Sequence, residues 1–135
     1  MDRFNLFIPM EPVAKGRPRM TSQGRPYTPA KTAAYEKALK LFLKRGAGER
    51  PPITGSLTCR ISFVISRPKS VPFKKRANPT VKPDLDNLAK AVLDAANGIL
   101  WEDDAQICQL TVEKAYTWEA GRPGSILLEV SEMVR

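Results

Sequence analysis

The chain has 135 residues, of which 42% are hydrophobic and 27% are charged. This length suits one compact domain, and the apolar content is too high for general disorder. Lys and Arg outnumber Asp and Glu by 22 to 14, which gives a formal net charge of +8. Such a charge favours a polyanionic partner, either nucleic acid or an anionic membrane surface. We therefore expect a single domain, residues 1–135, that binds a polyanion.

Several kinds of site are excluded by composition. The sequence contains no histidine, so histidine general bases, Ser-His triads and mixed His/Cys zinc sites are ruled out. Cys59 and Cys108 are isolated and form no disulfide framework, which points to the reducing cytoplasm. The apolar run after Met1 is too short for a signal peptide, and no later segment is long enough to span a bilayer. Any catalysis must use carboxylates, lysine or a bound metal.

The first third of the chain predicts a strand, a basic loop and a helix. Apolar residues alternate from Phe4 to Ile8 and stop at Pro9, which is typical of a strand. Residues 15–29 carry Pro and Gly at a density that only a loop tolerates. Thr28 can cap a helix that Pro29 opens. Apolar residues then recur at helical spacing until Gly46, and they are Tyr35, Ala38, Leu39 and Phe42.

The middle of the chain predicts a strand, a second basic loop and a second helix. Apolar residues occupy every second position from Leu57 to Ile65, with mostly polar residues between them, and this is the clearest strand of the sequence. Residues 67–82 contain prolines and six cations without one acid, and we expect a mobile basic loop. A helix should begin near Asp84 and end at Asn97-Gly98, with an apolar face. That face comprises Leu85, Leu88, Val92, Ala95 or Ala96, and Ile99.

The last third predicts a closing β-hairpin. Residues 108–118 alternate, a Gly-Arg-Pro-Gly turn follows at 121–124, and residues 126–130 alternate again. The expected order is β-α-β-α-β-β. This order indicates an α+β single domain in which two main helices pack on a mixed β-sheet.

Acidic residues are concentrated where the chain is otherwise basic, at Asp84 and Asp86 and again at 102–104. At about 100° per residue, Asp86, Lys90 and Asp94 share a helix face away from the apolar stripe. The sequence thus places charged groups together on the side of the helix that does not enter the core.

One cluster of Asp84, Asp86, Asp103 and Asp104 is geometrically possible. Asp104 lies beyond the helix end, roughly 20 Å from its start at 1.5 Å per residue. About seven extended residues at ~3.3 Å each are just long enough to return to Asp86. Carboxylates without histidine or thiolate form a hard-oxygen site, which suits Mg²⁺ or Mn²⁺ and not zinc.

A structural interpretation of these acids stands beside the metal site. Asp84 follows a proline and suits a helix N-cap, and Asp86 in the first turn complements the helix dipole. Asp86 with Lys90, and Lys90 with Asp94, are i,i+4 pairs that usually mark a solvated helix face. The residues alone support a metal site and a structural role equally.

The sequence from Asp84 resembles a known family. Asp84-Leu85-Asp86-Asn87-Leu88-Ala89-Lys90, the later Asn97-Gly98-Ile99-Leu100-Trp101, and Asp103-Asp104-Ala105-Gln106 resemble the signature of RusA-type Holliday junction resolvases. Lys15-Gly16-Arg17-Pro18-Arg19 and Tyr27-Thr28-Pro29 resemble its phage-type members. The resemblance implies a homodimer of mixed α/β fold that binds four-way DNA junctions and makes paired nicks with Mg²⁺. Paired nicks across a two-fold junction also call for two sites related by a two-fold axis.

The resemblance also implies roles for individual residues. The essential aspartates fall on Asp84, Asp86 and Asp104, the essential lysine falls on Lys90, and Asp103 joins the metal ligands. We expect Mg²⁺ as cofactor, with Mn²⁺ as a substitute. Cations of the two basic loops are the candidate contacts to the DNA backbone. They are Lys15, Arg17, Arg19, Arg25, Lys74, Lys75, Arg76 and Lys82.

Two aromatic residues near these groups invite different interpretations. Trp101 is expected to be a packing anchor that positions the Asp103-Asp104 turn. Phe73 stands among cations, and both a wedge into a DNA junction and a core or interface role remain open for it.

Two other functions compete with a junction-cutting nuclease. One is a non-catalytic dimeric protein that binds branched DNA, in which the acids only cap a helix and shape a loop. The other is a phosphohydrolase or transferase that uses an Asp-x-Asp nucleophile or metal clamp on a small phosphate ester. The sequence lacks an Asp-x-Asp-x-Thr motif on a strand and a glycine-rich phosphate loop, which argues against the second.

Overall fold

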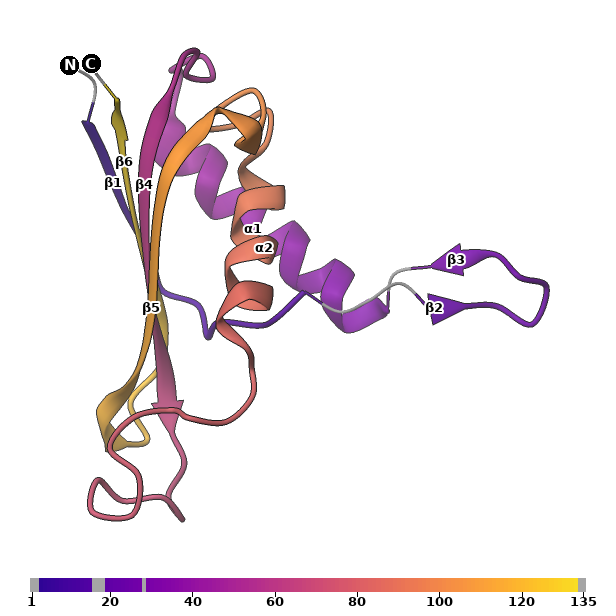
Figure 1. Ribbon diagram of the computed structural model, residues 1–135. Coiled ribbons are helices and arrows are strands. Elements are labelled where there is room, and N and C mark those ends of the chain that lie inside the picture. Colours follow the sequence, from indigo (N-terminus) through magenta and orange to yellow (C-terminus); the bar gives the residue numbers. More distant parts are fainter. Residues whose placement is uncertain (1–2, 16–18, 28, 134–135) are drawn as a thin grey trace.

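The computed structural model describes residues 3–15, 19–27 and 29–133. Both helices pack on one face of a four-stranded sheet, and the opposite face is open (Figure 1). The elements in chain order are β1 (Arg3–Ile8), β2 (Arg19–Met20), β3 (Pro26–Tyr27), α1 (Ala30–Ala47), β4 (Leu57–Arg67), α2 (Leu85–Ala96), the short 3₁₀ helix η1 (Asp104–Gln106), β5 (Ile107–Ala120) and β6 (Ser125–Glu132). This confirms the α+β class, the mixed sheet and the two main helices.

The main sheet has the strand order β1-β6-β4-β5. β4 and β5 run parallel, whereas β6 is antiparallel to both of its neighbours, β1 and β4. Parallel neighbours need a long crossover connection, and the segment between β4 and β5 contains α2. The topology therefore places α2 against the sheet beside β5.

The prediction of a closing hairpin is wrong, because its two strands do not pair with each other. Both strands form, but β4 lies between β5 and β6. The alternating core residues of β4 are almost completely buried, so β4 occupies the middle of the sheet, whereas β5 has many exposed residues and takes the edge. The connection at 121–124 must span two interstrand spacings, about 10 Å, which a four-residue turn can reach.

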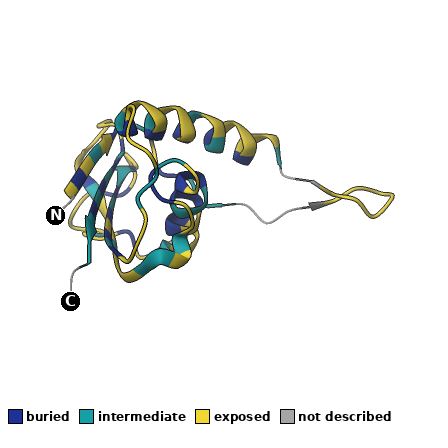
Figure 2. Ribbon diagram, turned by 90° about the horizontal axis from the view of Figure 1, so that it is seen from above, coloured by how far each residue is buried: buried dark blue, intermediate teal, exposed yellow. Residues whose placement is uncertain are grey.

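The core lies between the sheet and the inner faces of the helices, as the burial colouring in Figure 2 shows. α2 buries the apolar face predicted for it, including Leu88 and Val92 at 0% exposure. It ends at Ala96 with Asn97 as its C-cap, followed by Gly98 with φ of 77°, a conformation that favours glycine. α1 likewise buries Tyr35 and Leu39. Thr28, the expected cap of this helix, lies outside the described residues.

The first basic loop contains a small antiparallel hairpin, β2–β3, where no strand was expected. Only two residue pairs form this ladder, which is too short for a periodic pattern to reveal it. The hairpin projects away from the rest of the molecule (Figure 1). In the part of the chain that the structure describes, neither helix combines the length and the apolar composition needed to cross a membrane.

Candidate functional site

Asp84 and Asp86 stand at the N-terminal end of α2. Asp84 occupies the N-cap position with φ of −71° and ψ of 142°, yet its side chain caps no backbone N–H among the described residues. Both side chains are exposed. The capping role expected from a structural interpretation is therefore not performed by the Asp84 carboxylate, and its oxygens are free to bind another group.

Lys114 attaches the start of α2 to the sheet. Its side chain points to the helix-covered side of β5, and its Nζ donates to the carbonyl oxygens of Val81, at 3.0 Å, and Pro83, at 2.8 Å. Pro83 immediately precedes Asp84 in the chain, and Val81 lies three residues before it. A charged donor shared by two carbonyls is a strong restraint, so Lys114 positions the segment that presents Asp84. The sequence carried one signal for this role, a lysine at a position of β5 whose side chain faces the helices.

Lys90 and Asp94 share one face of α2, as predicted, with the Lys90 Nζ 3.9 Å from Asp94 Oδ2. Asp94 has a closer partner, because Lys15 Nζ lies 2.8 Å from the same oxygen and 3.3 Å from Glu36 Oε1 of α1. The hydrogen bond to Asp94 is the main cause that raises the pKa of Lys15. Lys15, expected to contact DNA, thus joins the segment after β1 to both helices.

Asp103 and Asp104 lie at the other end of α2. Asp103 caps η1, since its side chain accepts from Ala105 N at 2.9 Å and Gln106 completes a capping box. Trp101 is fully buried and its Nε1 donates to Asn97 Oδ1 at 2.8 Å. This confirms that Trp101 is a packing anchor below the Asp103-Asp104 turn.

Asp104 is surrounded by groups that disfavour its charge. Partial burial is the first cause that raises its pKa, and Asp103 and then Asp94 add to it, while a hydrogen bond with Asn97 opposes the rise. The Asp104 carboxylate is therefore near Asp94. Its ionised form is less stable than that of an isolated aspartate, a condition that a nearby cation would relieve.

The two groups of acids are separated by most of the length of α2. The eight residues from Asp86 to Asp94 rise about 12 Å along the axis, and Asp104 lies at the Asp94 end. Carboxylate oxygens that share a Mg²⁺ ion each lie only about 2.1 Å from it. Among the described residues of one chain, no three Asp, Glu, Cys or His side chains gather closely enough to hold a metal ion. Asp103 and Asp94 lie near Asp104, whereas Asp84 and Asp86 lie at the opposite end of α2.

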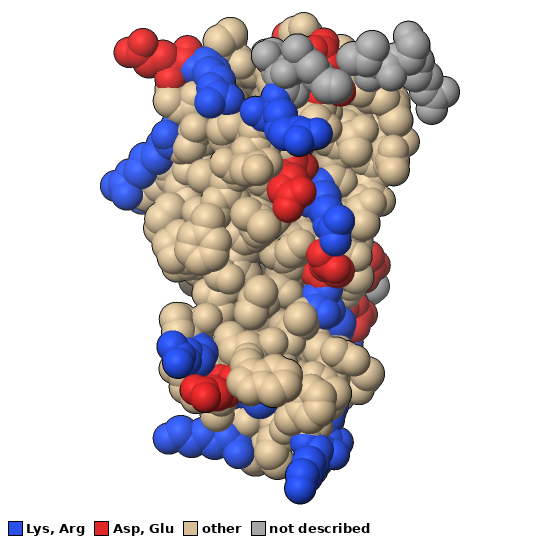
Figure 3. All heavy atoms as spheres, turned by 90° about the vertical axis from the view of Figure 1, so that its left-hand side faces the viewer, with Lys and Arg blue, Asp and Glu red and all other residues tan. Residues whose placement is uncertain are grey.

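The predicted DNA contacts lie in three places. Lys74, Lys75 and Lys82 are exposed in the loop between β4 and α2, and Arg25 is exposed beside β3. Arg76 is half-buried and its Nη1 donates to the Tyr116 hydroxyl at 3.3 Å. Arg19 falls in β2, and Arg17 lies outside the described residues. At the lower end of the face in Figure 3, Lys and Arg side chains and an acidic patch border uncharged surface.

Arg67 is a structural residue that sequence reasoning assigned to a mobile loop. It ends β4, is 5% exposed, and directs its guanidinium into the following loop. Its nitrogens donate to four carbonyl oxygens, of Thr117, Val71, Arg76 and Ala77, at 2.7 to 3.0 Å. The sequence did indicate that Arg67 is buried, because the alternation that points every second residue of β4 into the core continues to position 67. These bonds give residues 71–77 a defined shape.

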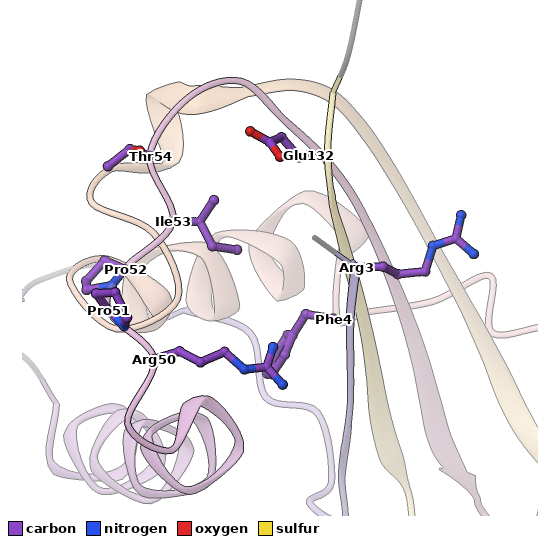
Figure 4. A pocket seen from close by; sticks show the side chains of 8 residues that line it. All are labelled: Arg3, Phe4, Arg50, Pro51, Pro52, Ile53, Thr54 and Glu132. Atoms are coloured by element: carbon purple, nitrogen blue, oxygen red, sulfur yellow. The ribbon is translucent and has the colours of Figure 1, made fainter. Parts of the chain in front are cut away.

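A surface pocket of about 570 Å³ opens at the other end of the sheet, between the start of β1 and the segment after α1 (Figure 4). Arg50 stacks over the Phe4 ring there, with its Cζ 4.9 Å from the ring centroid. As far as the described residues show, its lining includes none of the candidate aspartates. We assign the pocket no part in the candidate site.

Comparison with known proteins identifies the family of the chain. The model of the family "Endodeoxyribonuclease RusA" matches residues 9–123. The chain is also similar to "Uncharacterized protein YqaN" of Bacillus subtilis (strain 168), with 34% identity over 143 aligned positions that cover 97% of this chain and 99% of the relative. The family match includes β4, α2, η1 and β5, and hence all of the candidate aspartates. The chain belongs to the RusA family of endodeoxyribonucleases.

Proposed function

We propose that the protein is a Mg²⁺-dependent, structure-specific endodeoxyribonuclease that resolves four-way DNA junctions by paired, symmetric nicks in recombination and repair. The observation that carries the proposal is the exposed Asp84-Asp86 pair at the start of α2, in which Asp84 occupies the cap position without capping. Membership of the RusA family supports the nuclease chemistry.

Asp84, Asp86 and Asp104 are the proposed ligands of the metal ion, with Asp103 beside them. Their donor set consists of carboxylate oxygens, which fits Mg²⁺ and accepts Mn²⁺. When bound, the ion supplies charge stabilisation at the scissile phosphate and lowers the pKa of an attacking water. Lys90 is exposed one helical turn after Asp86, and we assign its ammonium group to the developing negative charge on the phosphate.

The separation of the acid pairs supports action as a homodimer. Within one chain, Asp86 and the Asp94 end of α2 are about 12 Å apart along the helix, too far for a shared ion. A second copy that brings its Asp103-Asp104 end beside the first copy's Asp84-Asp86 end would complete two equivalent ligand sets. Two sites related by a two-fold axis are what paired nicks in a two-fold junction require.

Basic side chains would bind the DNA backbone at a distance from the cut. We propose this role for Arg25, Lys74, Lys75, Arg76 and Lys82, and for Arg17 and Arg19 of the first loop. Contacts to phosphate give affinity that falls with salt concentration but carry no sequence information. Lys15 is better explained by its ion pairs with Asp94 and Glu36.

Nick mapping tests the activity. An immobile four-way junction and a linear duplex of matched sequence are incubated with the protein in Mg²⁺ or in EDTA. Symmetric nicks in the junction alone, and only with metal, are the expected result. Junction binding without nicks in either Mg²⁺ or Mn²⁺ would support the second candidate, a non-catalytic branched-DNA-binding protein, which the capping role of Asp103 favours.

Mixed dimers test whether the ligand set is shared. Asp86→Asn and Asp104→Asn chains are each expected to be inactive alone. If each site combines Asp86 of one chain with Asp104 of the other, a mixed dimer contains one intact site and makes single nicks. If each site lies within one chain, both sites of the mixed dimer are damaged and no nick appears, which would refute the shared arrangement.

A further inference from the structure

Two large aromatic side chains meet on the surface at the end of the sheet away from the chain termini. Phe73, in the loop after β4, and Trp118, near the end of β5, have ring centroids 5.1 Å apart at an interplanar angle of 42°. Phe73 is 50% exposed and Trp118 is 76% exposed. We call this pair the aromatic tip. Single exposed apolar residues are common, whereas contiguous exposed apolar surface is characteristic of binding sites, and the aromatic tip joins two such residues.

The aromatic tip is held from beneath by Arg67. The Arg67 guanidinium lies 4.7 Å from the Tyr116 ring centroid and 5.9 Å from the Phe73 ring centroid. The same group donates to the carbonyls of Val71 and Arg76, on either side of Phe73. Phe73 is therefore presented on a loop whose backbone is restrained before any partner binds. Such preorganisation lowers the entropic cost of binding.

The surroundings of the aromatic tip are cationic. Besides the buried Arg67, residues 68–83 include five Lys and Arg residues and no acid. Near the end of β5, the acid Glu119 has its Oε2 3.5 Å from Arg122 Nη2, so its charge is offset. Exposed aromatic rings within a basic surface are the combination that binds nucleic acid with unpaired bases, because cations attract the backbone and rings stack on bases.

We propose that the aromatic tip stacks on unpaired nucleobases of branched DNA. This inference rests on the proposed function for its substrate class and adds how the branch point is recognised. A perfect duplex hides the faces of its bases, whereas a branch point exposes some of them. Stacking is tolerant of sequence because every base has a π-face, so the tip would distinguish structure without choosing a sequence.

The tip is connected to the candidate catalytic end of α2. The chain runs from Phe73 through residues 74–83 directly to Asp84, and Lys114 of β5 holds the end of this loop. Trp118 lies four residues along the same strand from Lys114. A base seated on the tip is thus coupled through two short segments to the backbone that presents Asp84.

Binding measured in EDTA tests the proposal without any dependence on cleavage. Wild type, Phe73→Leu and Trp118→Leu are compared on a four-way junction, on a duplex with a bulge of unpaired thymines, and on a perfect duplex. Loss of one stacked base predicts about tenfold weaker binding to the junction and bulge, while duplex binding, dominated by phosphate contacts, stays within about twofold. Trp118→Phe, which keeps a stacking ring, should largely restore binding.

Phe7→Leu is the matched control. Phe7 is 60% exposed on β1, at the opposite edge of the sheet, and its loss should leave binding to all three DNAs unchanged. Equal weakening on the perfect duplex and the bulge would overturn the proposal, because the rings would then only support the basic loop. A change of sedimentation in Phe73→Leu without DNA would also overturn it, since the tip would then be a contact between protein copies.

Trp118 provides a second measurement within the folded wild type. The other tryptophan, Trp101, is fully buried, whereas Trp118 is 76% exposed. Stacking on a base should quench Trp118 fluorescence on addition of bulged duplex but not of perfect duplex, and Trp118→Phe should lack this change. Absence of quenching at saturating bulged duplex would contradict the proposal. Failure of Mg²⁺-dependent cleavage, in contrast, would count against the proposed function and leave these binding results intact.

Discussion

The ammonium group of Lys114 donates to the carbonyl oxygen of Pro83 at 2.8 Å, one residue before Asp84. We predict that Lys114→Met, which keeps the aliphatic stem, lowers single-turnover cleavage of a junction about 10- to 100-fold, because small displacements of reacting groups are costly. Stability should fall by about 2 kcal/mol. Lys37→Met, which removes an exposed charge from α1, is the control. Equal cleavage by both variants would show that Lys114 does not position Asp84.

Lys15 should stabilise the fold through Asp94 over a defined pH range. Its pKa is raised above the ordinary value of 10.5, chiefly by Asp94. A group with a raised folded-state pKa contributes fully below its unfolded pKa and loses that contribution as pH rises through the folded pKa. Lys15→Met should therefore cost about 1 kcal/mol in urea unfolding, constant from pH 6 to 9 and shrinking above pH 10.5. If the loss of stability in Lys15→Met is unchanged at pH 11, the loss comes from packing of the side chain and not from its ion pair with Asp94.

Arg67 should be essential for the shape of the loop that carries Phe73. Arg67→Met leaves four carbonyl oxygens without their donor, and we expect a loss of about 3 kcal/mol of stability. Amide hydrogen exchange should accelerate in residues 71–77 more than in α1. Uniform acceleration over the whole chain would instead indicate that the loop unfolds only with the domain.

The two cysteines should differ in reactivity. Cys59 is fully buried on β4, and burial raises the pKa of its thiol to about 12, whereas Cys108 is exposed on β5. Because the thiolate is the reactive form, a maleimide at pH 7 should modify Cys108 within minutes and Cys59 only after denaturant is added. Cys108→Ser should abolish the rapid reaction. Rapid labelling of Cys59 in that variant would contradict the central position of β4.

Local patterns predicted the elements better than their arrangement. Alternation located β1 and β4, and the apolar stripe from Leu85 to Ala96 located α2 almost to the residue. The same alternation could not tell that β5 pairs with β4 and not with β6, since it does not show which strand takes the middle of the sheet. Arg67 was assigned to a loop because charge suggests exposure, although its inward register on β4 was visible.

The sequence predicted which residue types form the candidate site, but it predicted only part of the arrangement of those residues. The positions of Asp84 and Asp86 on the first turn of α2 follow from a helix boundary that the sequence marks clearly. The contact between Lys15 and Asp94 joins residues 79 positions apart, and no local pattern encodes it. The sequence left it possible that the path after α2 returns to Asp86; in the structure, Trp101 bonds to Asn97 and Asp103 caps η1 just after the C-terminal end of α2.

The most direct test of the central claim is cleavage of an immobile four-way junction in Mg²⁺ by wild type, Asp86→Asn and Glu119→Gln, with junction binding measured in parallel in EDTA. Glu119 is an exposed acid on β5, so its variant controls for the change in charge. The account predicts paired nicks by wild type and Glu119→Gln, and at least a 1000-fold slower reaction by Asp86→Asn with binding retained or tightened. Near-wild-type cutting by Asp86→Asn would contradict it, because the start of α2 would then not hold the metal.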